Sequence, residues 1–333
     1  HIVTIDAEAY WATAPDEGAL RQTTLAPPST TAEPAEVLIE TLYSGVSRGS
    51  EALVAGGRVP PSQHTVMRCP FQEGAFPFPV KYGYSNVGTV LAGPSELVGR
   101  TVFCLYPHQT RYVVPAAAVH VLPDALPARR AVLTANLETA LNAVWDATLL
   151  PGERIVVIGA GVVGCLIARL AVQLPGAEVT LVDIDPAKAE IADALGVPFR
   201  TAFEPDMAAD CLINASAAPA ALAAAMGAAG LEARIVEVSW YGDAVVPLPL
   251  GEAFHSRRLR LVASQVGNVS SAVRARFDHG RRLVKVMDIL AQDDCLEALI
   301  DGQTAFRDLP RAMPQLMRGK GLCHAVRYER ASP

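Results

Sequence analysis

Three glycines at positions 159, 161 and 164 have the spacing of a loop that holds a pyrophosphate. Residues 151–164 read PGERIVVIGAGVVG. The apolar run 155–158 predicts a central parallel strand, and Gly159 permits the tight turn that follows it. Gly161 lets the backbone approach a phosphate, while Gly164 lets the next helix pack closely and direct its N-terminus at the negative charge. The motif predicts a dinucleotide site, with Val162 and Val163 also against the cofactor.

An acidic residue ends the second strand of this region. The apolar run 179–182 is followed by Asp183, which lies 19 residues beyond Gly164. A carboxylate there can bind both ribose hydroxyls of NAD and repels the 2′-phosphate of NADP. Alternatively Asp183 only caps the strand, although Asp185, before Pro186, is the better helix cap and Gly196 closes that helix. We expect NAD, with NADP as the alternative, and Ile184 as a further contact.

The elements that must position this loop fall into three stretches. Up to about residue 130 the sequence has short strand-like runs at 37–42, 87–91, 101–105 and 111–114, broken by Pro and Gly, which predicts a small β-barrel. From 131 to 267, strand-like runs alternate with Ala-rich helical stretches, which predicts a parallel sheet covered by helices. Helices are then expected at 271–292 and 309–318, and a strand at 324–328. We predict an α/β protein with a barrel domain over 1–138, a doubly wound parallel sheet over 139–267 and a return to the first domain over 268–333.

Composition excludes several classes of protein. The 333 residues carry a net charge of -6, and no basic stripe is available to pair with nucleic-acid phosphates. The uncharged stretches are too short or too rich in Gly and polar residues to span a membrane, and no signal peptide is evident. The six cysteines are scattered without a Cys-x-x-Cys pair, as in a reducing compartment. We expect a cytoplasmic protein without nucleic-acid or membrane partners.

Four stretches together resemble the medium-chain dehydrogenase/reductase superfamily. They are SGVSRGSE at 44–51, YGYSNVG at 82–88, the glycine loop at 151–164 and SQVG at 264–267. Residues 81–88, 136–142 and 264–267 look most like the subgroup named for 2-desacetyl-2-hydroxyethyl bacteriochlorophyllide a dehydrogenase. The resemblance implies a GroES-like β-barrel catalytic domain, a Rossmann domain, an alcohol dehydrogenase-like oxidoreductase activity on a small molecule, and a homodimer.

The residues at the family's zinc positions are not zinc ligands here. Zinc-dependent members have a Cys in the first motif, Gly-His-Glu in the second and another Cys before the Rossmann helix. This chain has Ser47, then Tyr84 with Ser85, and Ala135 at the third position. Zinc takes thiolate, imidazole or carboxylate ligands, and the four-cysteine loop of structural zinc is also missing. We therefore expect no metal.

A site without zinc needs a side chain that handles the hydroxyl proton. Tyr84 is the first candidate, with Lys81 beside it to lower its pKa and Ser47 at the adjacent ligand position. Alternatively, Tyr84 packs its ring on the barrel and Lys81 is a solvated charge. His108 is the second candidate, because its intrinsic pKa suits proton relay; the alternative is a structural histidine bonded to a backbone carbonyl.

Further cofactor contacts follow from the resemblance and from strand ends. The resemblance implies a pyrophosphate contact for Arg48, and nicotinamide or substrate contacts for Asn136 and Thr139, for which helix capping is the alternative. The carboxyl ends of parallel strands line the cofactor crevice of such sheets. That rule and the resemblance add Ala215, Ser216, Val238, Ser239, Gln265 and Val266.

Three functions remain open. The first is a zinc-independent oxidoreductase that transfers a hydride between NAD and an alcohol or carbonyl compound. The second is an NADPH-dependent reductase of enones or quinones, against which Asp183 argues. The third is a dinucleotide-binding protein without activity.

Overall fold

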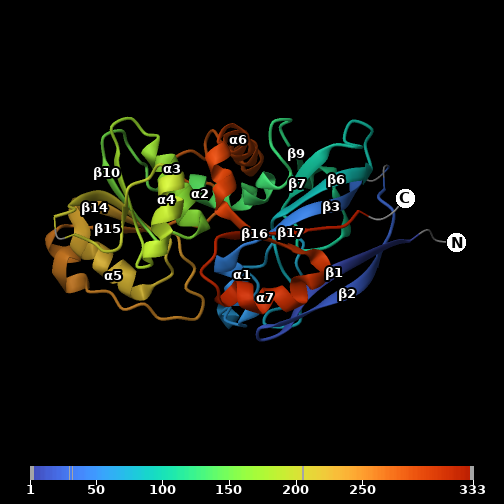
Figure 1. Ribbon diagram of the computed structural model, residues 1–333, viewed down its shortest axis with the longest axis horizontal. Helices are drawn as coiled ribbons and strands as arrows, with labels where there is room; N and C mark the ends of the chain where they lie inside the picture. The colour runs from blue at the N-terminus through green and yellow to red at the C-terminus, as the bar shows by residue number, and fades with distance from the viewer. Residues whose placement is uncertain (1–3, 30, 32, 205, 331–333) are drawn as a thin grey trace. The chain divides into compact units, whose positions relative to one another are not determined.

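The computed structural model describes residues 4–29, 31, 33–204 and 206–330. They belong to two units (Figure 1). Unit 1 comprises His1–Ala135, Met287–Asp294 and Ile300–Pro333, and unit 2 comprises Asn136–Val286 and Cys295–Leu299. The first boundary lies close to the expected residue 138. The return to unit 1 comes at Met287 rather than at 268, because the first half of helix α6 (His279–Gln292) is bonded to helix α2 (Thr134–Asp146) of unit 2.

Unit 1 consists mainly of two sheets. The larger has the order β16-β17-β3-β6-β7-β9, with β8 also paired to β3. The smaller has the order β2-β1-β5-β4. The strands are β1 Ile5–Ala14, β2 Glu17–Leu25, β3 Glu36–Val46, β4 Glu73–Gly74, β5 Val80–Lys81, β6 Asn86–Ala92, β7 Thr101–Cys104, β8 Arg111–Pro115, β9 Val119–Val121, β16 Ile300–Ala305 and β17 Cys323–Arg327. The unit also contains helices α1 (Arg48–Ala55) and α7 (Leu309–Arg318).

The four short runs expected as strands in the first part of the chain correspond to β3, β6, β7 and β8. Their inward side chains, among them Val37, Ile39, Val102 and Tyr112, form a buried core. Of the candidate catalytic residues, Ser47 precedes α1, Lys81 is in β5, Tyr84 precedes β6 and His108 lies between β7 and β8.

Unit 2 is built on one six-stranded sheet in which all strands are parallel. The order is β12-β11-β10-β13-β14-β15, which is the doubly wound order with the first strand, β10, in the middle. The strands are β10 Arg154–Ile158, β11 Glu178–Val182, β12 Phe199–Arg200, β13 Ala209–Asn214, β14 Ala229–Glu237 and β15 Arg260–Ala263. Helices α3 (Val162–Val172), α4 (Ala189–Ala194) and α5 (Pro219–Ala228) connect them.

One helix starts later than its sequence pattern indicates. The expected helix 271–292 begins at His279, and residues 271–276 form turns. The carboxylate of Asp278 accepts a hydrogen bond from Arg281 N at 2.7 Å, which is the bond of a helix N-cap. The expected helix 309–318 and the closing strand are confirmed, and α7 contains Pro314.

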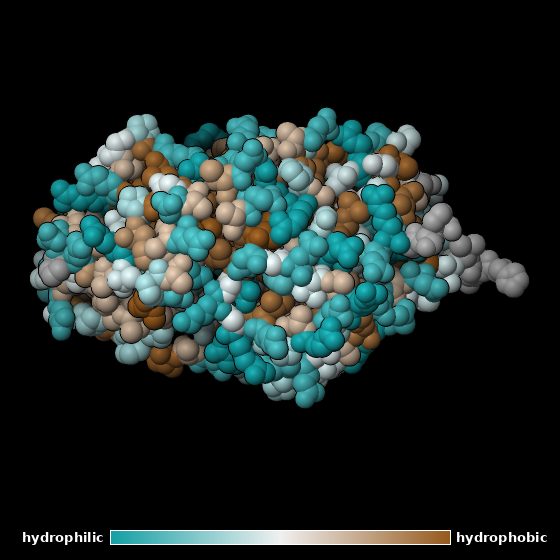
Figure 2. Space-filling model, viewed as in Figure 1, coloured by the Kyte–Doolittle hydropathy of each residue, from teal (hydrophilic) through white to brown (hydrophobic). Residues whose placement is uncertain are grey.

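Hydrophilic residues cover most of the face drawn in Figure 2, and hydrophobic residues are scattered between them. Within the described part of the chain, no helix combines the length and the apolar character needed to cross a bilayer.

Candidate functional site

The glycine loop of unit 2 has the geometry that its sequence indicates. Gly159 has φ +93°, and a Cβ there would lie 2.8 Å from the Cα of Ser216, so only glycine fits. A Cβ on Gly164 would lie 1.7 Å from Gly159 O, which confirms the close packing of α3 on β10. A Cβ on Gly161 would meet none of the described atoms within 4 Å, so this side of the loop is open. Because α3 begins at Val162, Val163 is also in its first turn, and a phosphate can reach this N-terminus.

Asp183 directly follows β11, and its carboxylate is hydrogen-bonded to the glycine loop. Its Oδ2 accepts from Ala160 N at 2.8 Å and its Oδ1 accepts from Asp185 N at 2.9 Å. Each carboxylate oxygen keeps lone pairs that can accept from a ribose hydroxyl. Ile184 beside it is 91% exposed. The expected helix cap is confirmed, since Asp185 Oδ1 accepts from Ala187 N, and Gly196 has φ +66°.

The ends of β13 and β14 meet at the same edge of the sheet. Ala215 N donates to Ile158 O, and Val238 N donates to Asn214 O. Ser216 Oγ donates to Asn214 Oδ1 at 2.7 Å, and Ser239 Oγ accepts from Ala217 N at 2.9 Å. The structure therefore places Ala215 and Ser216 beside the glycine loop, and Val238 and Ser239 beside residues 214–217 at the same edge.

Sequence reasoning missed Glu237 at this edge. Its carboxylate accepts from Asn214 Nδ2 at 2.7 Å, from Tyr241 Oη at 2.9 Å and from Ser239 N at 2.7 Å. Burial, and then the Glu237 charge, raise the pKa of Tyr241. The available signal was that Glu237 ends β14 in register with Asn214 of β13.

The remaining expected nicotinamide contacts lie on α2 and after β15. Ser264 N donates to Glu237 O, so Gln265 and Val266 follow at the carboxyl edge of the sheet. Asn136 is buried in the first turn of α2, and Thr139 is half-buried. The capping alternative for Thr139 is wrong, because α2 begins at Thr134.

In unit 1, three hydroxyl groups meet between the loop before α1 and the loop before β6. Tyr84 Oη donates to Ser47 Oγ at 2.7 Å and lies 2.5 Å from Ser50 Oγ. We call Ser47, Ser50 and Tyr84 the hydroxyl cluster. Burial and the Glu51 charge raise the pKa of Tyr84 to about 12. The phenol is thus protonated at neutral pH and suited to donate a hydrogen bond or a proton.

The expected pairing of Lys81 with Tyr84 is wrong. Lys81 is 1% exposed, and its Nζ donates to Gln109 Oε1 at 2.6 Å, Glu73 Oε1 at 2.8 Å and Tyr106 Oη at 3.3 Å. It is therefore neither a solvated charge nor a neighbour that lowers the pKa of Tyr84. The residue lies on the short strand β5, whose pairing with β4 brings it opposite Glu73. No pattern in the residues around Lys81 indicates that strand pairing.

His108 is buried beside the Glu51 carboxylate. Its Nε2 lies 2.7 Å from Glu51 Oε1, and the two residues are 1% and 4% exposed. Its Nδ1 lies 2.7 Å from Ser44 Oγ, which is 2.9 Å from Tyr328 Oη. Both ring nitrogens are therefore bonded to side chains, rather than to the backbone carbonyl of the structural alternative.

Glu51 connects this pair to the hydroxyl cluster. Its Oε2 accepts from Ser47 N at 2.5 Å, and this bond fixes the first residue of the cluster. Sequence reasoning assigned no role to Glu51, Ser44 or Tyr328, which come from a helix, a strand and the distant C-terminal segment.

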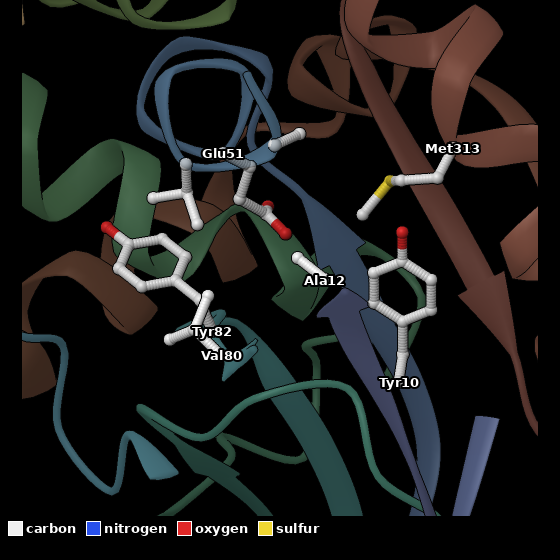
Figure 3. A pocket seen from close by; sticks show the side chains of 8 residues that line it. Tyr10, Ala12, Glu51, Val80, Tyr82 and Met313 are labelled. Atoms are coloured by element: carbon white, nitrogen blue, oxygen red, sulfur yellow. The ribbon is translucent and has the colours of Figure 1, made fainter. Parts of the chain in front are cut away.

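A small cavity lies on the other side of Glu51. Figure 3 shows the Glu51 carboxylate pointing into the space between Tyr10 and Tyr82. The cavity has a volume of about 20 Å³ and is lined mainly by apolar side chains, including Val54, Val80 and Met313. That volume suits a single water and is far below that of a ligand pocket. The cavity is therefore not a substrate site.

Arg48 does not point freely from its helix. Its Nε donates to Leu322 O at 2.8 Å and its Nη1 donates to Leu316 O at 2.5 Å. A guanidinium beside the last carbonyls of α7 stabilises that helix end. A pyrophosphate contact would require exchange of these bonds, so that role stays a prediction.

The residues at the positions where the resemblance implies zinc ligands do not fit a metal. Ser47 and Tyr84 are bonded to each other and Ala135 has no ligand atom, while Ser85 Oγ donates to Val132 O. Among residues 4–29, 31, 33–204 and 206–330, no group of three His, Cys, Asp or Glu side chains could hold a metal ion.

Comparison with known proteins supports the fold. The family model of the alanine dehydrogenase/PNT C-terminal domain matches residues 144–239. L-idonate 5-dehydrogenase from Escherichia coli superposes with a TM-score of 0.79 at 15% identity, over 98% of this chain and 99% of that one. The fold is thus shared with solved dehydrogenase structures. Unit 1 is the GroES-like domain, and unit 2 is the Rossmann domain.

Sequence relatives agree with this assignment. The chain is 27% identical to 2-dehydro-3-deoxy-L-galactonate 5-dehydrogenase from Pseudoalteromonas atlantica over 230 residues, 65% of each chain. It is 43% identical to an uncharacterized zinc-type alcohol dehydrogenase-like protein from Haemophilus influenzae over 83 residues, 25% of this chain and 24% of that one. The chain is thus similar in sequence to dehydrogenases, and each of these matches spans less than two thirds of the relative's length.

Proposed function

We propose that this protein is an NAD-linked oxidoreductase that interconverts an alcohol and a carbonyl compound without zinc. The observation that carries the proposal is the hydroxyl cluster, in which Ser47 and Tyr84 are hydrogen-bonded at the positions where the family resemblance implies zinc ligands. The glycine loop with Asp183 supports the cofactor assignment.

The cofactor would bind along the carboxyl edge of the unit 2 sheet. The N-terminus of α3 would hold the pyrophosphate, and Asp183 the adenosine ribose. When bound, the nicotinamide ring supplies or accepts the hydride. The residues at the ends of β13, β14 and β15 would orient it.

Tyr84 would handle the proton. During carbonyl reduction the hydride adds to carbon, and the oxygen takes a proton from Tyr84 Oη, because an alkoxide is a much stronger base than a phenolate. The serines of the cluster then donate to the phenolate until solvent returns the proton. Burial raises the pKa of Tyr84 to about 12, so at neutral pH the phenol carries the proton that carbonyl reduction requires.

His108 would act through Glu51 as a positioning residue. The His108–Glu51 pair holds Ser47 N, and the Glu51 charge helps to keep Tyr84 protonated. This replaces the proton relay expected for His108, since neither of its ring nitrogens is available to a substrate.

Other features support the wider proposal. Two relatives are named 2-dehydro-3-deoxy-L-galactonate 5-dehydrogenase and probable D-xylulose reductase A, so polyols and their ketones are the first substrates to test. All six cysteines are free thiols, which supports a cytoplasmic location.

Edge strand β15 exposes Leu261, which supports a homodimer formed at this edge. The stretches 81–88, 136–142 and 264–267 support placement in the subgroup named above.

The test is a turnover screen of purified protein. We expect NADH oxidation with a ketone or aldehyde, loss of most turnover in Tyr84→Phe, and normal turnover in Tyr112→Phe, whose hydroxyl is bonded to Asn86 in the barrel core. Enone-dependent oxidation of NADPH would instead support the reductase alternative. Tight NADH binding without turnover on any substrate would support the non-catalytic one.

A further inference from the structure

The largest fully buried side chain of the described residues is a charged one, Arg282 of α6. Its guanidinium donates to three groups on two other elements of unit 2. Nη1 donates to Asn142 Oδ1 at 2.9 Å, and Nη2 donates to Glu138 Oε1 at 3.0 Å and to Val266 O at 2.7 Å. Arg282 therefore ties helix α2 to the segment that follows β15.

Asn142 makes a second set of bonds to the same segment. Its Nδ2 donates to Asn268 O at 3.0 Å, and its Oδ1 accepts from Ser270 N at 3.0 Å. At the surface, His279 Nε2 lies 2.9 Å from Gly267 O. Carbonyls of residues 266, 267 and 268 are thus all held by side chains of α2 and α6.

The elements joined in this way carry the nicotinamide end of the proposed cofactor site. Segment 264–270 begins at the carboxyl edge of the sheet, and α2 carries Asn136 and Thr139. The phosphate and ribose contacts lie elsewhere, on the glycine loop and at Asp183. The network therefore touches one end of the site only.

The ion pair in this network is not optimised for stability. Glu138 Oε2 and Arg282 Nε are buried without a hydrogen-bond partner among the described residues. A buried ion pair with unmade bonds is a poor source of folding stability compared with apolar packing. Such exceptions tend to persist where their geometry serves a function.

We infer that Arg282, with Glu138 and Asn142, is a positioning residue that sets segment 264–270 for the nicotinamide half of the cofactor. This inference rests on the proposed function. It predicts that perturbing the network weakens binding of the whole cofactor but not of its adenosine diphosphate part.

The experiment compares NADH with ADP-ribose, which is the cofactor without its nicotinamide ring. Arg282→Lys keeps the charge but cannot reach the three acceptors together. Calorimetric titration should show NADH binding weakened at least about tenfold, because the hydrogen bonds that order segment 264–270 are lost, with ADP-ribose affinity unchanged within about twofold. The NADH fluorescence shift on binding should also decrease.

Arg234→Lys is the matched control. Arg234 also pairs with a half-buried glutamate of unit 2, Glu153, at 2.8 Å, but it lies at the amino-terminal half of the sheet. Its loss should lower stability and leave the ratio of NADH to ADP-ribose affinity unchanged.

His279→Ala provides an independent test if Arg282→Lys does not fold. His279 is exposed, so its replacement removes the bond to Gly267 O without disturbing the core. We expect a smaller selective loss of NADH affinity, about twofold to fivefold. Equal weakening of NADH and ADP-ribose, or no change in either variant, would overturn the inference. If the unaltered protein binds neither compound, the proposed function itself fails.

Discussion

The preference for NAD over NADP depends on one carboxylate, and Asp183→Asn tests it at nearly constant shape. Asp183 is half-buried and bonded to the glycine loop. The 2′-phosphate of NADPH would carry a charge of about -1.5 to -2 next to it. Two unit charges about 4 Å apart repel by about 1 kcal/mol in water and more in a protein, so the phosphate would be disfavoured by about 2 kcal/mol or more. That corresponds to an affinity difference of about 30-fold.

The asparagine removes this charge and one acceptor. Hydrogen bonds to a charged acceptor contribute about 1.5–3 kcal/mol, so NADH should bind about tenfold more weakly in Asp183→Asn. NADPH should bind more tightly, and the ratio of the two dissociation constants should fall at least about tenfold. Calorimetric titrations with each cofactor measure this ratio.

Asp185→Asn serves as the matched control. It removes the same charge two residues away, where Asn caps a helix as well as Asp. The ratio should change by less than about twofold in this variant. An unchanged ratio in Asp183→Asn, or an equal change in both variants, would refute the ribose assignment.

The remaining predictions concern the hydroxyl cluster and the surface. Tyr84→Phe should reduce turnover at least about tenfold. In the unaltered protein, the rate of carbonyl reduction should not fall up to about pH 10, because a pKa near 12 keeps the Tyr84 phenol protonated. A fall in that rate with an apparent pKa near neutrality would show that another group donates the proton. Glu51→Ala leaves Ser47 N and His108 Nε2 without their buried acceptor, so urea unfolding should show a loss of about 2–6 kcal/mol, and a loss below about 1 kcal/mol would contradict the described pair. Leu261→Glu should shift a dimer to monomer by light scattering, whereas an unchanged mass would place the interface elsewhere.

The geometry of the glycine loop in unit 2 could largely be predicted from sequence because its determinants are local. Gly159 and Gly164 are required by a turn and a helix contact within six residues, and Asp183 ends a neighbouring strand. Parallel-strand topology then brings Ser216 and Ser239 to the same edge. Glu237 was missed because a carboxylate at the end of a strand has no distinctive pattern in a single sequence.

The arrangement of the candidate catalytic residues in unit 1 could be predicted only in part. The motifs indicated that Ser47 and Tyr84 would share a site, and their hydroxyls are in contact. The partners of Lys81 and His108 were not predictable, because they depend on pairings across 28 and 57 positions with Gln109 and Glu51. Local spacing suggested that Lys81 lies beside Tyr84, but β-sheet pairing directs it to Glu73 instead.

The most direct test of the central claim is the zinc content of active protein purified without a chelator. Ser47 and Tyr84 offer hydroxyls where zinc requires thiolate or imidazole, so elemental analysis should find well under one zinc per chain in protein that oxidises NADH with a carbonyl substrate. One zinc per chain, with turnover lost on its removal and restored on its return, would contradict the claim.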